Sequence, residues 1–393
     1  MGRALALLVA AALALPATAA AQDLTIYSSL PLVGVIEPQS LDTLRGEQLA
    51  LEQAGGRAGA FSIRLASLND GTRTAGTWTP DRVAENARRA AQDPTTIAYL
   101  GEFNSGASGI SIPLLNEAGI LQVSPGNAYV GLTRREAAQP GEPARYYPTN
   151  QRTFGRVSQA DHLQAAAVAA LLQQEGAKRV FLVDDLEVYG DGLADMVRRR
   201  MKARGVRFAG RRHLRKRNAA AIARAIRRSG ADAMFYGGIA ENGAARLWRA
   251  VHRRNPKTAL LAPEGVTDRA FARSLSRGAA RRTLVTNPTL DPAAYPPAAQ
   301  AFYAAFRARF GHEPQAYAIY GYEAMSVVLD AIARAGSADR EAVVNAFRAT
   351  RDRDSVLGRY SIDANGDTTL STYGVFKVSR GRLVYDRTID SAR

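Results

Sequence analysis

The chain has 393 residues, a length that predicts two or three domains. Its 46% hydrophobic content is enough for a packed core and excludes wholesale disorder. Cysteine is absent, which excludes disulfides, thiolate metal sites, cysteine nucleophiles and a lipid-modified cysteine. The four histidines are far apart and argue against a zinc enzyme, so we expect no metal and no other cofactor.

The N-terminus has the parts of a secretory signal peptide. Arg3 is followed by the apolar run Ala4–Leu15, which is too short to span a bilayer core of roughly 30 Å. Small residues at Ala19–Ala21 then precede Gln22. We expect residues 1–21 to be removed and the mature protein to be periplasmic and not a lipoprotein. No later stretch is apolar for 18 residues, so no membrane span is predicted.

The net charge of +16 is concentrated in one region. Residues 178–282 hold 26 Lys and Arg against 9 Asp and Glu. Clustered arginines favour a nucleic-acid partner, but the export signal and the lack of interleaved aromatic residues argue against one. We therefore expect no nucleic acid and mainly solvated charges on helix faces and ends, and attraction to an acidic membrane surface or acidic partner stays open.

After residue 22 the first half alternates short apolar runs with helical patterns. Thr79-Pro80-Asp81 combines an N-cap, a proline at the first helical position and an acidic first turn, which together predict a helix start. The predicted strands are Leu24–Ser28, Phe61–Leu68, Thr96–Leu100 and Ile120–Ser124, and the other helices are Leu41–Ala54 and Ser105–Ala118. This alternation predicts βαβ units around a parallel sheet.

The same alternation restarts after the Pro- and Gly-rich segment Pro140–Pro148. The predicted strands are Val180–Val183, Val206–Ala209, Ala233–Tyr236, Ala259–Leu261 and Leu284–Thr286, with helices at His162–Gln174, Gly190–Ala203, Ala219–Arg228 and around Leu247. Helices dominate Pro297–Thr350, and a hairpin is predicted at Tyr373–Val378 and Leu383–Tyr385. Two α/β halves followed by helices and terminal strands predict two lobes joined by more than one crossover.

Motifs for catalysis are missing. The sequence has no phosphate-binding loop, no nucleophile elbow and no EF-hand loop. Asp363–Asp367 lacks the acidic end position of a calcium loop, and a turn is the better interpretation. The neighbouring acids Asp184 and Asp185 end a strand without forming an obvious acid/base pair. No motif requires an enzyme.

Loops that follow predicted strands are the candidates for binding, because open α/β sheets place ligands at the carboxyl ends of their strands. In Gly101–Gly106, Ser105 and the free N–H groups of the next helix suit a carboxylate, although Asn104 or Ser105 alternatively serves only as an N-cap. Ser124–Ala128 is a tight turn with backbone groups to offer. Glu264, between Pro263 and Gly265, suits an ammonium group or is simply a solvated loop acid.

Several short motifs, in this order and spacing, resemble the periplasmic substrate-binding proteins of ABC transporters of the branched-chain amino acid (leucine/isoleucine/valine) type. They are Leu100–Ser105, Asn116–Pro125, Val188–Ala194, Phe235–Gly238, Pro263–Val266 and Tyr320–Ala324. The resemblance covers essentially the mature chain. It implies a type I periplasmic-binding fold, with two Rossmann-like lobes of parallel sheets joined by three hinge crossovers. The implied lobes are 22–158 plus 288–370 and 159–287 plus 371–393.

The resemblance also implies which residues contact the ligand: Ser105, Gly126, Ala128, Tyr189 and Glu264, with Asp161 as a further candidate. Ser105 and the backbone groups of Gly126 and Ala128 would bind a carboxylate. Tyr189 would contact the ligand from the second lobe, and Glu264 would pair with its α-ammonium.

The sequence departs from the family pattern at three points. Ala128 stands where many relatives carry a threonine hydroxyl, the loop Pro31–Val35 lacks an aromatic residue, and Ile239 replaces a tyrosine. The expected function is therefore capture of an amino acid or a similar small molecule and its delivery to the permease subunits of an ABC transporter. The alternatives are a sensory or regulatory binding protein of the same fold and a two-lobed α/β enzyme.

Overall fold

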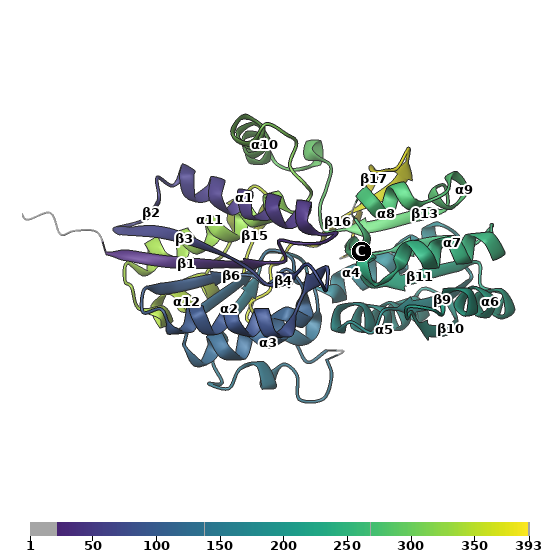
Figure 1. The fold of residues 1–393 in the computed structure, drawn as a ribbon, viewed down its shortest axis with the longest axis horizontal. Helices are drawn as coiled ribbons and strands as arrows, with labels where there is room; N and C mark the ends of the chain where they lie inside the picture. The colour runs from purple at the N-terminus through teal and green to yellow at the C-terminus, as the bar shows by residue number, and fades with distance from the viewer. Residues whose placement is uncertain (1–21, 137, 268, 392–393) are drawn as a thin grey trace, which may run out of the picture.

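A computed structural model of the protein describes residues 22–391 except 137 and 268. The predicted signal peptide, residues 1–21, lies outside the described residues. The chain forms two lobes, each built around its own twisted sheet (Figure 1). Among the described residues, no helix is both long and apolar enough to cross a membrane.

The sheet of the first lobe has the strand order β2-β3-β1-β6-β7-β8. Its strands are β1 (Asp23–Leu30), β2 (Arg57–Ala58), β3 (Phe61–Asn69), β6 (Thr96–Leu100), β7 (Leu121–Ser124) and β8 (Phe154–Arg156). All neighbours are parallel except β2 and β3. The alternation of strands and helices in the sequence predicted this arrangement, apart from the two short edge strands.

Helices cover both faces of the first sheet. They are α1 (Glu37–Gln53), α2 (Pro80–Gln92), α3 (Ser105–Glu117), α10 (Pro297–Phe310), α11 (Ala318–Ala335) and α12 (Arg340–Arg348). Successive residues of β1 point to opposite faces, so Ile26 packs with α1 and α11, and Tyr27 packs with α2 and α3. The α1–α11 contact is close because Gly46 lies against the Ala318 carbonyl, where a Cβ atom would overlap it.

The sheet of the second lobe has the order β10-β9-β11-β12-β13-β16-β17. Its strands are β9 (Arg179–Asp184), β10 (Arg207–His213), β11 (Ala233–Gly237), β12 (Ala259–Ala262), β13 (Thr283–Asn287), β16 (Thr372–Ser379) and β17 (Arg382–Asp390). The first five are parallel, and the terminal hairpin β16–β17 adds antiparallel to β13. The predicted two-lobed α/β fold is confirmed, with two mostly parallel sheets in which only β2 and the terminal hairpin pair in the opposite sense.

Helices of the second lobe are α4 (Asp161–Gln174), α5 (Val188–Ala203), α6 (Ala219–Ser229), α7 (Ala244–Arg254), α8 (Arg269–Ser274) and α9 (Arg277–Ala280). In β9, Leu182 packs with α4 and α5, whereas Val183 packs with α6 and α7. The short pairs β4 (Gly71–Thr72) with β5 (Thr77–Trp78) and β14 (Arg353–Ser355) with β15 (Gly358–Tyr360) lie outside both sheets and were not predicted.

The chain crosses between the lobes three times: from β8 to α4, from β13 toward α10, and from the segment after β15 to β16. Buried Arg156 at the end of β8 binds Asp367 near the third crossing, with 2.8 Å between Nε and Oδ1. Arg134 binds the other oxygen of Asp367 at 2.6 Å. The Asp363–Asp367 segment is thus a turn held by arginines, in agreement with the sequence.

Glu47 of α1 is a buried carboxyl group whose ionisation affects the stability of the first lobe. The carboxylate is buried, and among the described residues only the Ser28 hydroxyl approaches it, without reaching good hydrogen-bond geometry. Burial raises the pKa of Glu47 to about 8 from its ordinary value near 4.5, and the Ser28 hydroxyl offsets this only in part. The folded state thus holds this proton more tightly than the unfolded state, so the free energy of unfolding falls as pH rises through this range.

We expect Glu47→Gln to raise the melting temperature by several degrees at pH 8 and to change it little at pH 5, because glutamine resembles the protonated acid. Thermal unfolding followed by circular dichroism measures the difference. Glu117→Gln, at an exposed position of α3, is the matched control. Equal shifts at both pH values would contradict this account of Glu47.

Candidate ligand-binding site

A cavity of about 690 Å³ lies between the lobes. The loops after β6 and β7 line it from the first lobe, and those after β9, β11 and β12 line it from the second. Five of the six predicted residues line this cavity: Ser105, Gly126, Ala128, Tyr189 and Glu264. Asp161 does not line it and lies behind the cavity wall.

Glu264 forms the acidic end of the cavity. It opens a short 3-10 helix after β12 and is 9% exposed. Its Oε1 accepts a hydrogen bond of 2.9 Å from the Tyr189 hydroxyl, and its Oε2 accepts one from Nε2 of Gln164. Burial raises the pKa of Glu264. Among the described residues, no Lys or Arg nitrogen lies within ion-pair distance of this carboxylate. The interpretation of Glu264 as a solvated loop acid is wrong, because the side chain is buried.

Asp161 adds a second buried carboxylate beside Glu264. It is the first residue of α4 and fully buried, and neither of its carboxylate oxygens has a hydrogen-bond partner in the described chain. Burial first and the neighbouring Glu264 second raise the pKa of Asp161 well above its usual range. Its N–H donates to the Ala128 carbonyl at 2.8 Å, so it touches the cavity loop through the backbone.

Ser105 lines the cavity from the first lobe, in the first turn of α3. Asn104 occupies the N-cap position but makes no side-chain capping bond, so capping does not explain this pair. Oγ of Ser105 accepts the N–H of Tyr129 at 3.2 Å, which leaves the hydroxyl proton available to a ligand. The first N–H groups of α3 point out of the helix end, as in anion-binding helix termini.

The turn after β7 offers one free amide. The N–H of Gly126 donates to Oγ of Ser124 at 3.1 Å and is already used. The N–H of Ala128 has no acceptor among the residues that the structure describes. Of the two backbone groups named from the sequence, Ala128 is therefore the one equipped to donate, and Gly126 provides close approach.

Hydrogen bonds of Glu102 hold the loop that precedes Ser105. The Glu102 carbonyl accepts from Ser124 Oγ at 2.7 Å and from Asn127 Nδ2 at 3.0 Å, and Oε1 of Glu102 accepts from the Tyr99 hydroxyl at 2.7 Å. Asp70 packs against Glu102, and burial raises the pKa of both carboxyls. Two adjacent buried acids are stable when one carries a proton that the other accepts.

The rest of the cavity is largely apolar. Phe103 and Tyr317 meet edge to face, with 5.1 Å between ring centroids, and Ile36 and Ile239 add aliphatic surface. Sequence reasoning missed the roles of Phe103, Gln164 and Tyr317. Phe103 lies inside a motif that was noted, but Gln164 and Tyr317 carry no local signal because only the fold brings them to Glu264.

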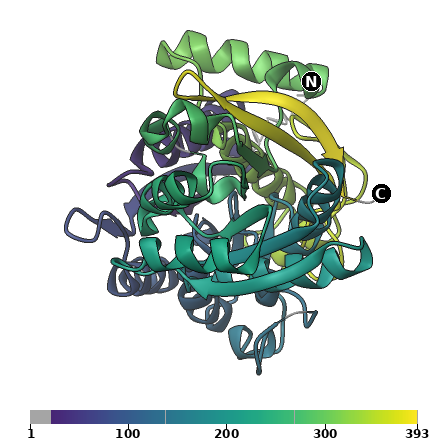
Figure 2. The same ribbon diagram turned by 90° about the vertical axis from the view of Figure 1, so that its right-hand side faces the viewer.

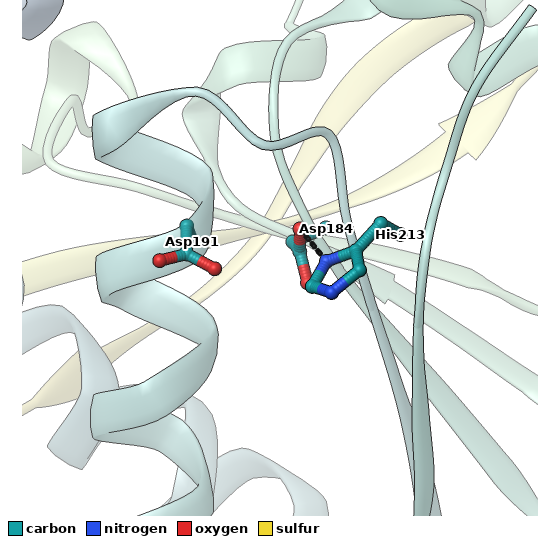
Figure 3. A group of neighbouring side chains, drawn as sticks. All are labelled: Asp184, Asp191 and His213. Atoms are coloured by element: carbon teal, nitrogen blue, oxygen red, sulfur yellow. Dashed lines mark hydrogen bonds and ion pairs between the residues drawn. The ribbon is translucent and has the colours of Figure 1, made fainter.

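Asp184, Asp191 and His213 form the one group of potential metal ligands in the described part of the chain (Figure 3). His213 Nδ1 lies 2.8 Å from Oδ1 of Asp184. The guanidinium of Arg211 lies among the same acids, with nitrogens 2.6 Å from Asp184, Asp191 and Asp195. An arginine thus supplies the positive charge here, and the acids have a structural explanation.

These features define a two-lobed solute-binding protein, with a ligand cavity enclosed by loops of both lobes. The family model described as periplasmic binding protein matches residues 26–382, and the chain belongs to this family. It is a non-catalytic solute-binding protein of the kind that serves ABC transporters.

Similar proteins align with this chain over nearly its whole length. A Leu/Ile/Val-binding protein, BraC3, of Rhizobium johnstonii is 26% identical over 372 residues, which cover 92% of this chain and 93% of the relative. The leucine-binding protein LivK from Thermotoga maritima has a TM-score of 0.80 at 26% identity and covers 93% and 99% of the two chains. A solute-binding protein from R. palustris, in complex with benzoate, has a TM-score of 0.75 at 18% identity, with 93% and 96% covered.

Asp161→Asn tests the buried acid. Because the folded state raises the pKa of Asp161, its free energy of unfolding falls as pH rises above the carboxyl's ordinary range. We expect the variant to melt several degrees above the parent at pH 8 without added ligand. Asp93→Asn is the control and should melt lower, because the Thr95 and Tyr27 donors hold the pKa of Asp93 below its ordinary value despite partial burial. A lower melting temperature for both variants would show that Asp161 stabilises the fold.

Proposed function

We propose that the protein is exported to the periplasm, binds an amino acid with an apolar side chain between its lobes, and delivers it to ABC permease subunits. The single observation that carries this proposal is Glu264, a buried acid without a cation. A buried carboxylate costs several kcal/mol unless it is paired, and a ligand ammonium group supplies the missing charge. Hydrogen-bond donors at Ser105 and Ala128 suit the carboxylate of the same ligand.

The apolar wall supports an amino acid whose side chain is aliphatic or aromatic. Phe103, Ile239 and Tyr317 are uncharged and supply apolar surface, although Arg269 and Arg273 also line the cavity. Relatives named for leucine, isoleucine and valine support the same class. The benzoate bound by the R. palustris protein has a carboxylate but no ammonium group, so Glu264 argues for an amino acid here.

We also propose that the lobes comprise 22–158 plus 288–370 and 159–287 plus 371–393. The strands before residue 158 belong to the first sheet, and α4 packs in the second lobe, which supports these boundaries. A ligand held by Ser105 and Glu264 contacts both lobes. Its binding would favour the closed arrangement over any open one.

Glu264→Gln tests the ammonium site. The variant keeps the size and an acceptor oxygen but loses the charge, so affinity for leucine, isoleucine, valine or phenylalanine should fall roughly 100-fold or more. Isothermal titration calorimetry on purified protein freed of ligand by unfolding and refolding measures the change. Glu187→Gln, at another acid of the cavity, is the control and should change affinity far less. Binding of benzoate in preference to amino acids, with equal affinity in both proteins, would contradict the ammonium site.

Ser105→Ala tests the carboxylate site. Loss of one hydrogen bond to a charged group should weaken binding by about 1–3 kcal/mol. Ser274→Ala is the matched control, because Ser274 lines the cavity but donates its proton to the Phe271 carbonyl at 2.7 Å. A change well below about 0.5 kcal/mol for Ser105→Ala would leave that hydroxyl a role only in holding the N–H of Tyr129.

A further inference from the structure

The basic charge of residues 178–282 gathers at one end of the second lobe. The parallel strands β9 to β13 all begin at the same edge of the sheet, where Arg179 is level with Arg207 and Val180 with Ala233. The connecting helices run the other way and end at that edge. Figure 1 shows this end as the part of α6 and α7 farthest from the first lobe, and Figure 2 looks onto it.

Six exposed side chains define what we call the distal basic surface: Lys202, Arg207, Arg227, Arg228, Arg253 and Arg254. They lie at the ends of α5, α6 and α7 and at the start of β10. None of the six has an acidic group within ion-pair distance in the described part of the chain. Exposed Arg281 and Arg282, which precede β13, extend the same end.

Two acids that precede strands at this edge of the sheet, Glu175 before β9 and Asp232 before β11, are already engaged. Glu175 binds Arg387 at 2.9 Å, and Asp232 accepts the backbone N–H groups of Lys178 and Arg179. Basic residues at helix ends are favoured by the helix dipole, but a dipole carries only about half an elementary charge at each end and does not neutralise several of them. The surface therefore retains a surplus of positive charge that no acid in residues 22–391, apart from the undescribed 137 and 268, neutralises by an ion pair.

An aromatic side chain lies beside this charge. Phe208 of the edge strand β10 is 41% exposed, and the Arg198 guanidinium lies 4.5 Å from its ring centroid. Arginines around an apolar side chain are typical of surfaces that lie on an anionic bilayer. Nucleic-acid surfaces instead use several stacking rings, and Phe208 is the only exposed aromatic residue in the described chain.

We propose that the distal basic surface binds the anionic phospholipid surface of a membrane. Its guanidinium groups pair with lipid phosphates, and release of counterions makes the attachment sensitive to salt. The ligand cavity lies at the opposite, carboxyl edge of the same strands, so attachment leaves the cavity accessible. This surface is independent of the proposed ligand.

Co-sedimentation with vesicles tests the proposal on the purified protein. We expect binding to phosphatidylcholine vesicles that contain one third phosphatidylglycerol, little binding to pure phosphatidylcholine, and release at about 0.5 M NaCl, where the Debye length is only a few ångström. A fourfold variant should bind the anionic vesicles roughly tenfold or more weakly. It carries Arg227→Gln, Arg228→Gln, Arg253→Gln and Arg254→Gln.

A control variant removes the same charge from exposed arginines of the first lobe. It carries Arg57→Gln, Arg73→Gln, Arg88→Gln and Arg135→Gln. Equal losses in the two variants would show that net charge alone attracts the protein and would overturn the site. Tighter binding to duplex DNA than to anionic vesicles at the same salt would overturn the lipid partner. If the fourfold variant does not fold, the double variant Arg253→Gln/Arg254→Gln must lose a smaller part of the binding.

Discussion

The buried carboxylate of Glu264 is the constraint from which the organisation of the cleft follows. Its two hydrogen-bond donors, Gln164 and Tyr189, both belong to the second lobe, so this lobe holds the acid without help from the first. Hydrogen bonds stabilise a buried anion only in part, and burial raises the pKa of Glu264 despite the Gln164 and Tyr189 donors. The first lobe presents the reverse condition, with the Ser105 hydroxyl and the Ala128 amide lacking an acceptor for their protons. Each lobe therefore carries one half of a polar site, and under the proposed function a zwitterion would complete both halves at once.

The loop between residues 126 and 129 connects this cleft to the hinge. Ala128 lines the cavity and accepts the N–H of Asp161 through its carbonyl, and the next carbonyl, that of Tyr129, accepts from Arg156 at 2.8 Å. Arg156 in turn binds Asp367 at the third crossing. Two of the three crossings are thus tied to the loop that would hold the ligand carboxylate. If this loop shifts when a ligand binds, these hydrogen bonds would move the crossing segments about which the lobes rotate.

The fold was largely predictable because its signals are local. Apolar runs such as Thr96–Leu100 and a helix start such as Thr79-Pro80-Asp81 specify their elements within a few residues. The motifs of the family resemblance likewise located Ser105 and Glu264, which follow strands directly. Burial and partners were not predictable. Whether Glu264 is solvated depends on Gln164, a hundred residues away, and whether Gly126 has a free amide depends on the rotamer of Ser124. Tyr317 reaches the cavity only because α11 packs under the first sheet.

The parallel strands of the second lobe all run in the same direction. The lobe therefore has buried acids at the carboxyl edge of its sheet and exposed basic residues at the amino edge. The carboxyl ends of β9, β11 and β12 meet the first lobe, and their loops have short turns that bring Asp185, Ile239 and Glu264 together. The amino ends face away, where every connecting helix ends and negative helix dipoles favour basic residues. Basic residues at that end lie a full strand length from the buried carboxylates of Asp161 and Glu264. The region between residues 178 and 282 can therefore be strongly basic as a whole and still provide an acidic ligand site.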